Sequence, residues 1–169
     1  MDAVEYLYGL GRRGIGWIFR YRSTSDRKKY EGYLKGVSKV GLQPHTLVVS
    51  EKSISQGLEA TGKLLDAFPD TDAIMYSSDL LAVGGVHCLH AQHISIPERI
   101  AVVGFNNSSS AMECYPPLTS VDNSIDECGT AAADMIVRML GHEQVDSITV
   151  PCGLVIRAST EGAAPCFSP

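Results

Sequence analysis

Two short polar runs each follow an apolar run, and they carry the side chains best suited to bind a small molecule. Residues 77–79 (Ser-Ser-Asp) come directly after the apolar residues 73–76, and residues 106–107 (Asn-Asn) follow the apolar residues 101–105. Hydroxyl, carboxylate and amide groups can hydrogen-bond a polar ligand from such positions. The same residue types also cap helices and end strands without any ligand, so residue type alone does not assign a binding role.

A second group of reactive side chains, His87, Cys88, His90 and His93, suggests a metal site at first sight. Helical spacing places His87 and His90 near each other, whereas His93 is rotated away from that face. A structural zinc site needs four ligands, and the sequence offers no clear fourth one. We therefore expect no metal here and interpret the histidines as part of a solvated or interface-forming helix.

Motifs of common catalytic sites are missing from the sequence. It contains no GxSxG, HExxH, P-loop or GxGxxG pattern. Cys114 has no motif partner, and the carboxylates of Asp122, Asp126 and Glu127 are explained by a helix start, where the helix dipole favours negative charge. The prediction is a protein that is not an enzyme and needs no cofactor.

The elements that would position the two polar runs follow a regular pattern. Apolar strands begin near Ile15, Thr46, Ala73 and Ala101, at about the 30-residue interval of a βαβ unit, with helical patterns between them. Right-handed crossovers then give a parallel open sheet with helices on both faces. The carboxyl ends of the strands share one edge, which is where small molecules bind in open α/β sheets, so both polar runs are expected there.

Residues after 107 are less regular. Residues 125–140 place Ile125, Cys128, Met135 and Met139 on one helical stripe. Residues 147–157 suggest a pair of strand-like pieces interrupted by proline and glycine, and residues 161–169 suggest a loose tail.

Composition limits the possible partners. The chain has 169 residues, is 44% hydrophobic and 20% charged, and carries a net charge of -5, which indicates one globular domain without a basic surface for nucleic acid. The densest basic stretch, residues 20–29, lacks interleaved aromatic residues and is interpreted as a polar loop at a pocket mouth or facing solvent. No apolar run reaches the roughly 18 residues of a membrane span.

Five cysteines are widely spaced and odd in number, without a CxxC pair. This pattern predicts neither a disulfide framework nor a zinc motif. It favours a reducing, cytoplasmic location.

Three blocks make the sequence recognisable: residues 76–84 (YSSDLLAVG), 96–107 (IPERIAVVGFNN) and 116–121 (PPLTSV). In order and spacing they resemble the effector-binding domain of the LacI/GalR transcription regulators. The resemblance implies the C-terminal lobe of a periplasmic-binding-protein-like fold in residues 1–121. It further implies a crossover helix in residues 122–146, closing strands in residues 147–160, and a loose tail in residues 161–169.

The same resemblance implies four ligand-binding residues. Lys29 matches a family arginine that hydrogen-bonds effector oxygens, Ser78 a strand-end asparagine, Asn106 a carboxylate that often holds sugar hydroxyls, and Lys52 a loop that often offers a stacking aromatic residue. Asparagine lacks the negative charge of the carboxylate, and lysine is a point charge without the planar fork of arginine. These departures favour a phosphorylated or carboxylated sugar over a neutral one.

As a function, the resemblance implies an effector module of a dimeric regulator. Most of the N-terminal lobe and the helix-turn-helix headpiece that contacts DNA would lie outside this chain. The helix that carries His87 and His90 would contribute to the dimer contact and make it sensitive to pH. Without the other lobe, the 125–140 helix is expected to self-associate or to move onto its own lobe.

Two other functions are compatible with the architecture. A periplasmic sugar-binding protein of a transporter has the same fold, and an α/β enzyme would have a similar sheet. The missing catalytic motifs disfavour the enzyme. The unpaired cysteines and the ending in residues 154–160 (LVIRAST), which resembles that of the repressors, favour the regulator.

Overall fold

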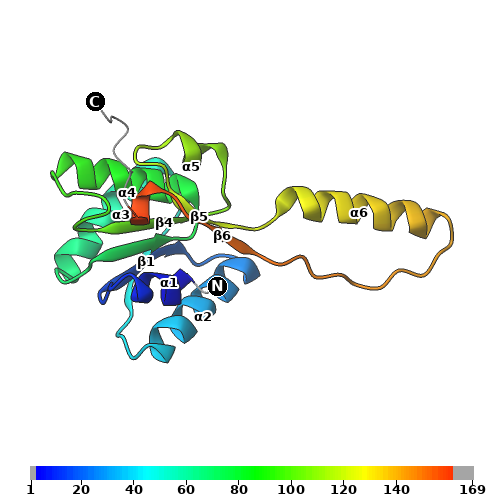
Figure 1. Cartoon of the computed structure of the whole chain (residues 1–169), viewed down its shortest axis with the longest axis horizontal. Helices are drawn as coiled ribbons and strands as arrows, with labels where there is room; N and C mark the ends of the chain where they lie inside the picture. The colour runs from blue at the N-terminus through cyan, green and yellow to red at the C-terminus, as the bar shows by residue number, and fades with distance from the viewer. Residues whose placement is uncertain (1–2, 162–169) are drawn as a thin grey trace.

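One six-stranded sheet forms the centre of the molecule in the computed structural model, which describes residues 3–161 (Figure 1). The strand order is β2-β1-β3-β4-β5-β6. The first five strands pair in parallel, and β6 is antiparallel to β5. This confirms the predicted parallel open sheet and adds an antiparallel edge strand. The strands are β1 (Ile15–Arg20), β2 (His45–Val49), β3 (Ala73–Tyr76), β4 (Ala101–Phe105), β5 (Thr119–Asp122) and β6 (Gly153–Val155).

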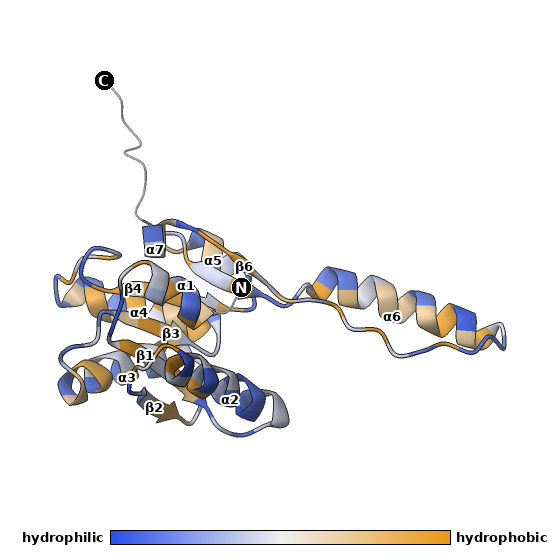
Figure 2. Ribbon diagram, turned by 60° about the horizontal axis from the view of Figure 1, so that its bottom comes forward, coloured by the Kyte–Doolittle hydropathy of each residue, from blue (hydrophilic) through white to orange (hydrophobic). Residues whose placement is uncertain are grey.

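Helices cover both faces of the sheet, as predicted, because side chains alternate along each strand. In β1, Trp17 and Phe19 pack with buried residues of α1 and α2, whereas Ile18 packs with those of α3 and α4. Figure 2 shows the most hydrophobic colours on the strands between these helices. The helices are α1 (Ala3–Gly9), α2 (Thr24–Lys39), α3 (Ile54–Ala67), α4 (Asp79–Ala91), α5 (Ser109–Glu113), α6 (Ile125–Leu140) and α7 (Ala158–Glu161).

Glycines let α3 and α4 approach each other closely. A Cβ atom at Gly84 would lie 2.0 Å from the carbonyl oxygen of Ile54, and one at Gly57 would lie 2.2 Å from that of Leu81. Both neighbours are backbone atoms, which cannot rotate away. The start of α4, which bears Ser78, is thereby held firmly against α3.

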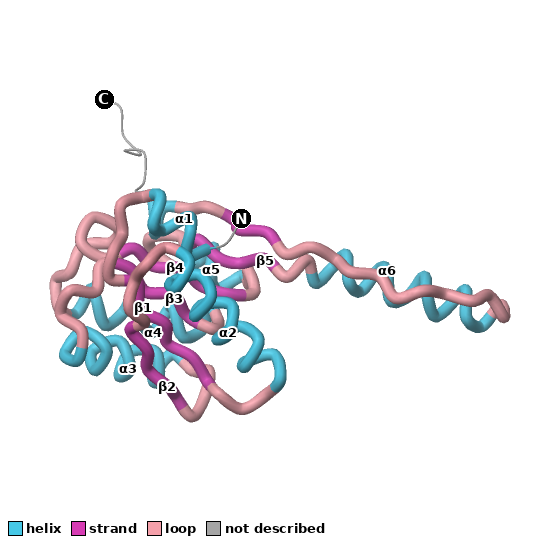
Figure 3. The backbone as a smooth tube through the Cα atoms, turned by 90° about the horizontal axis from the view of Figure 1, so that it is seen from below, coloured by secondary structure: helices cyan, strands magenta, loops and turns pink. Residues whose placement is uncertain are grey.

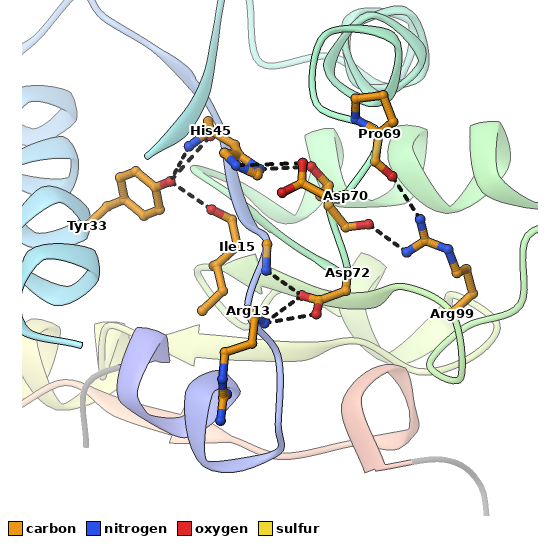
Figure 4. A network of polar contacts seen from close by, with 10 residues as sticks. Arg13, Ile15, Tyr33, His45, Pro69, Asp70, Asp72 and Arg99 are labelled. Carbon is orange, nitrogen blue, oxygen red and sulfur yellow. Dashed lines mark hydrogen bonds and ion pairs between the residues drawn. The ribbon is translucent and has the colours of Figure 1, made fainter. Parts of the chain in front are cut away.

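A polar network ties together the amino ends of the strands, opposite the edge where ligands are expected (Figure 4). The Asp72 carboxylate accepts hydrogen bonds from the backbone N–H of Arg13 at 2.8 Å and of Gly14 at 3.0 Å. The Tyr33 hydroxyl donates to the carbonyl oxygen of Ile15 at 2.7 Å and accepts from the His45 N–H at 3.0 Å. These bonds satisfy strand-end backbone groups and fix the register at which the strands reach the opposite edge.

Helix α6 and the chain that returns from it project away from the sheet (Figures 1 and 3). No residue of α6 is buried, and its apolar stripe is covered only in part, by Ile148 and Val150 of the returning chain. The helix forms where it was predicted, but it does not lie on its own lobe.

The expectation of two strand-like pieces in residues 147–157 is wrong in part, because only β6 forms there. Ile148 and Val150 instead line a hollow together with residues of α6 and belong to no strand. Glu161, assigned to the loose tail, ends the short helix α7, and residues 162–169 of that tail lie outside the described residues. Within residues 3–161, no helix is long and apolar enough to cross a membrane.

Candidate functional site

The two polar runs emerge at the same edge of the sheet, as the sequence predicted. Strands β3 and β4 are parallel neighbours, with Ala73 opposite Ala101 and Met75 opposite Val103. Ser78 and Asn106 follow the carboxyl ends of these two strands. The carboxyl edge of the sheet is therefore the candidate site.

Ser78 and Asp79 have local structural roles at this edge. Buried Ser78 is the N-cap of α4, and its Oγ accepts a hydrogen bond from the Leu81 N–H at 3.4 Å. The Asp79 carboxylate accepts hydrogen bonds from the Ser108 N–H at 2.7 Å and from the Ser120 hydroxyl at 2.7 Å. These contacts join the start of α4 to β5 and to the loop before α5.

Asn106 and Asn107 occupy different environments. The backbone of Asn106 has φ 108°, in the left-handed region, and its Oδ1 accepts a hydrogen bond from Nδ2 of Asn123 at 3.0 Å. Asn107 donates to the Asp122 carboxylate at 3.0 Å and accepts from the Arg157 guanidinium at 2.6 Å. The Asn107 side chain therefore connects β5 to the chain that follows β6.

Lys29 reaches from α2 across the carboxyl ends of β3 and β4. Its Nζ lies 3.5 Å from the centre of the Phe105 ring and donates to the Ser77 carbonyl oxygen at 3.3 Å. Burial, together with the nearby charge of Lys52, lowers the pKa of Lys29 to about 8, against the opposing effect of Asp26. The site therefore holds a partly desolvated amine whose position is fixed by an aromatic face and a carbonyl oxygen.

Lys52 is paired with a carboxylate that the sequence did not single out. Its Nζ lies 2.6 Å from Oδ1 of Asp26, whose side chain is fully buried. Asp26 also accepts from Nε of Arg20 at 3.3 Å and from the Ser23 N–H at 3.2 Å. Burial alone would raise the pKa of Asp26, but the hydrogen bonds from Lys52 and Ser23 hold it well below its usual range.

A cavity of about 320 Å³ adjoins Lys29. Trp17, Met75 and Phe105 give it an apolar lining, and Cys152, which precedes β6, is also part of its wall. Trp17 is buried, and its Nε1 has no hydrogen-bond partner in the described part of the chain. Phe105 could have been found from the sequence, since it directly precedes Asn106 at the end of a strand. Trp17 and Cys152 could not, because only the fold brings them to Lys29.

The histidines lie away from this edge. His87 and His90 line a hollow of about 460 Å³ that also involves Glu113, Cys114 and Tyr115. His93 follows the end of α4 with a left-handed backbone, as its spacing suggested. Among residues 3–161, no group of three His, Cys, Asp or Glu side chains is arranged to hold a metal ion.

A parallel open sheet, covered on both faces, with polar side chains and an adjoining cavity at its carboxyl edge, is an α/β lobe of the kind in which small molecules bind at that edge. Residues 4–160 match the family described as the periplasmic binding protein-like domain, and the chain belongs to this family.

Relatives of this chain are named as transcription regulators, in agreement with the resemblance seen in the sequence. An HTH-type transcriptional regulator of Lachnoclostridium phytofermentans is 29% identical, over 94% of this chain and 49% of its own length. The crystal structure of the transcription regulator GntR from Chromobacterium violaceum is 27% identical, with a TM-score of 0.89 over 94% of this chain and 60% of that one.

The structure of a transcriptional regulator CelR–cellobiose complex is 26% identical, with a TM-score of 0.81 over 94% of this chain and 50% of that one. The chain thus spans about half the length of the curated relatives it matches.

Proposed function

We propose that this chain is the effector-binding part of a LacI-type transcription regulator, in which the carboxyl edge of the sheet forms one wall of a ligand cleft. The observation that carries the proposal is the contact of Lys29 with Phe105 at that edge, beside a cavity, with Asn106 directly following Phe105 in the chain. Polar donors and acceptors next to an aromatic face suit a sugar-like ligand. The cellobiose complex of CelR, a protein of the same fold, supports this ligand class.

The second wall would come from another lobe. The segment of residues 122–146, which begins at the end of β5 and contains α6, would cross to that lobe, and the chain would return through β6. A ligand that binds one relative orientation of the lobes more tightly shifts the population towards it, and this shift would control operator binding by a helix-turn-helix headpiece. The role is binding rather than catalysis, and it would be exercised in the cytoplasm.

The four residues that we propose as ligand contacts do not contribute equally. Asp26 neutralises Lys52, so the attraction for an anionic ligand rests mainly on Lys29. With a pKa of about 8, Lys29 is mostly protonated at pH 7. Asn106 and Ser78 then supply uncharged hydrogen-bonding groups, and they do not repel a phosphate or carboxylate as an aspartate would.

Titration calorimetry on the intact regulator tests this proposal. Glucose, glucose 6-phosphate and gluconate, together with matched pairs of other sugars, give neutral and anionic ligands of similar size. We expect measurable binding within this set, with an anionic member bound most tightly. Lys29→Met should weaken that binding at least tenfold, whereas Lys35→Met, at an exposed position of the same helix, should leave it unchanged. Tight binding restricted to neutral sugars would refute the anionic preference.

A homodimer is the second part of the proposal. Leu80 of α4, Met112 of α5 and the adjacent Tyr115 are exposed apolar side chains near the hollow lined by His87 and His90. Such side chains on neighbouring elements are typical of an interface. Tyr115→Lys should shift the intact regulator towards monomer in sedimentation velocity, and an unchanged dimer would exclude this surface.

A further inference from the structure

The two connections that join the sheet to α6 run side by side. Strands β5 and β6 are antiparallel, and their last paired residues on this side are Asp122 and Gly153. One residue further out, Asn123 and Cys152 face each other. The contact continues beyond them, because the Ser124 hydroxyl donates to the carbonyl oxygen of Pro151 at 3.0 Å.

The thiols of Cys128 and Cys152, one from each connection, both hydrogen-bond to Asn123. Sγ of Cys128 donates to the Asn123 carbonyl oxygen at 3.8 Å, and Sγ of Cys152 donates to Oδ1 of the same residue at 3.9 Å. Cys128 also shares a small hollow with Val150 of the returning chain. Both Sγ atoms thus lie within 4 Å of an oxygen atom of one residue, Asn123, although the two cysteines are 24 positions apart in the sequence.

Both thiols are exposed, so small reagents reach them. The other cysteines of the described chain differ: Cys88 is buried and Cys114 is half-buried, and burial raises the pKa of both thiols, which makes them poorer nucleophiles at neutral pH. Among the cysteines of residues 3–161, reactivity towards a soluble oxidant should thus concentrate at the foot of α6.

We propose that Cys128 and Cys152 form an oxidisable dithiol, a modification site whose co-reactant is a low-molecular-weight disulfide such as oxidised glutathione. No residue of α6 is buried, so the foot of the helix can adjust to disulfide geometry without disturbing core packing. The widely spaced cysteines of the sequence gave no sign of this pair, because the fold alone brings the two connections together.

The reaction balances with one molecule of glutathione disulfide. The thiolate of one cysteine attacks a sulfur of the glutathione disulfide, forms a mixed disulfide and releases one glutathione thiolate, which takes up a proton. The second cysteine, as thiolate, attacks the protein sulfur of that mixed disulfide and releases the second glutathione. The protein loses two electrons and two protons, and glutathione disulfide is reduced to two thiols.

The cross-link would join the foot of α6 to the start of β6, next to the Lys29 cavity that Cys152 also lines. In the proposed regulator both connections lead to the other lobe, so the bond would restrict the lobe movement on which the effector acts. That consequence rests on the proposed function. The thiol chemistry does not, and its test requires neither ligand nor DNA.

The experiment treats the folded chain with a defined ratio of oxidised to reduced glutathione, blocks remaining thiols with iodoacetamide, and digests the protein with a protease that cleaves after glutamate. Because glutamates stand at positions 113, 127, 143 and 161, every cysteine falls on a different peptide. We expect the peptides 128–143 and 144–161 to be joined within one monomer and to make up most of the modified protein. Separate glutathione adducts on these peptides, or links from either one to another cysteine or to a second copy, would overturn the proposal.

Two serine variants and an unfolded control distinguish the proposed Cys128–Cys152 link from disulfides that form because of misfolding. Cys128→Ser should abolish the linked peptide pair and leave Cys152 as a glutathione adduct, whereas the matched control Cys114→Ser should leave the pair intact. The same oxidation in urea separates native proximity from chance pairing. If the Cys128–Cys152 link formed no more abundantly in the native chain than in the unfolded one, the pair would not be a feature of the fold.

Discussion

Nζ of Lys52 lies 2.6 Å from Oδ1 of Asp26, and this contact converts a surface cation into part of a buried charge cluster. Asp26 is also the third residue of α2, where its carboxylate accepts the Ser23 N–H and completes a capping box. Lys52 therefore links the loop after β2 to the start of the helix that carries Lys29. Lys52 thus mainly fixes the position of this loop against α2. Because its charge is paired with Asp26, only part of that charge is available to a ligand.

The cost of removing Asp26 should exceed that of removing its partner. Asp26→Asn removes the negative charge that pairs with both Lys52 and Arg20, and we expect a loss of about 3 kcal/mol in the free energy of unfolding. Lys52→Met leaves Asp26 with its remaining donors and should cost about 1 kcal/mol. Urea unfolding measures both.

The pH dependence of this effect has a definite sign. The pKa of folded Asp26 is lowered, so its contribution to stability is fully present above the unfolded value of about 4 and is lost as the pH falls towards the folded value. The stability difference between the native chain and Asp26→Asn should thus shrink below about pH 4. A difference that stayed constant through the acid range would show that folding does not lower the pKa of Asp26.

Ser78 combines a helix cap with a proposed ligand contact, and a matched serine separates the two roles. Ser53 caps α3 by accepting from the Gln56 N–H, as Ser78 caps α4. Ser78→Ala and Ser53→Ala should each reduce the free energy of unfolding by about 1 kcal/mol. Only Ser78→Ala should also weaken effector binding in calorimetry. Equal affinities of the two variants would leave Ser78 with the structural role alone.

The lowered pKa of Lys29 predicts how the affinity for an anionic effector changes at alkaline pH. Its pKa is lowered to about 8 by burial and by Lys52, so its positive charge is lost about 2.5 pH units earlier than that of an ordinary lysine. Affinity for an anionic ligand should fall by up to tenfold per pH unit above about 8. Lys29→Arg, which stays protonated, should remove this dependence if the variant still binds.

Stability should change in the opposite direction over the same range. Between about pH 8 and 10.5, the unfolded chain binds a proton at Lys29 that the folded chain does not, so the unfolding free energy rises with pH relative to that of Lys29→Met. If the difference in unfolding free energy between the two proteins did not change with pH, the desolvation of Lys29 would be contradicted.

The outline of the fold was predictable because it depends on local patterns. Apolar runs near Ile15, Ala73 and Ala101 gave three of the parallel strands, and the capping serine Ser78 gave the start of α4. Whether residues 147–155 form a strand depends on which segments lie beside them. Only β6 has a neighbouring strand, and the residues before it have none. Local pattern carries no information about such neighbours.

The site was predictable only in part, for the same reason. Strand-end residues such as Ser78 and Asn106 were placed at the correct edge, since parallel strands end together. Asp26 was not singled out from the sequence, because its contact with Lys52 depends on a loop 26 residues away. Contacts of this range follow from the fold and not from spacing.

Helix α6 supports the last prediction, that the 169-residue chain associates with itself. Ile136 and Met139 lie on the apolar stripe, and more than half of the surface of each is exposed. Uncovered apolar side chains on one helix face favour contact with a second copy. Sedimentation equilibrium from micromolar to near-millimolar concentration should show a rising mean mass.

A pair of double variants tests which face of α6 is responsible. Ile136→Lys with Met139→Lys puts two charges on the apolar stripe and should abolish the association. Thr130→Lys with Val137→Lys adds the same charge on the opposite side of the helix and should preserve it, since helical geometry places positions 130 and 137 more than a quarter-turn away from the stripe. Equal loss in both double variants would point to net charge rather than to the stripe, and a monomer at all concentrations of the native chain would contradict the prediction itself.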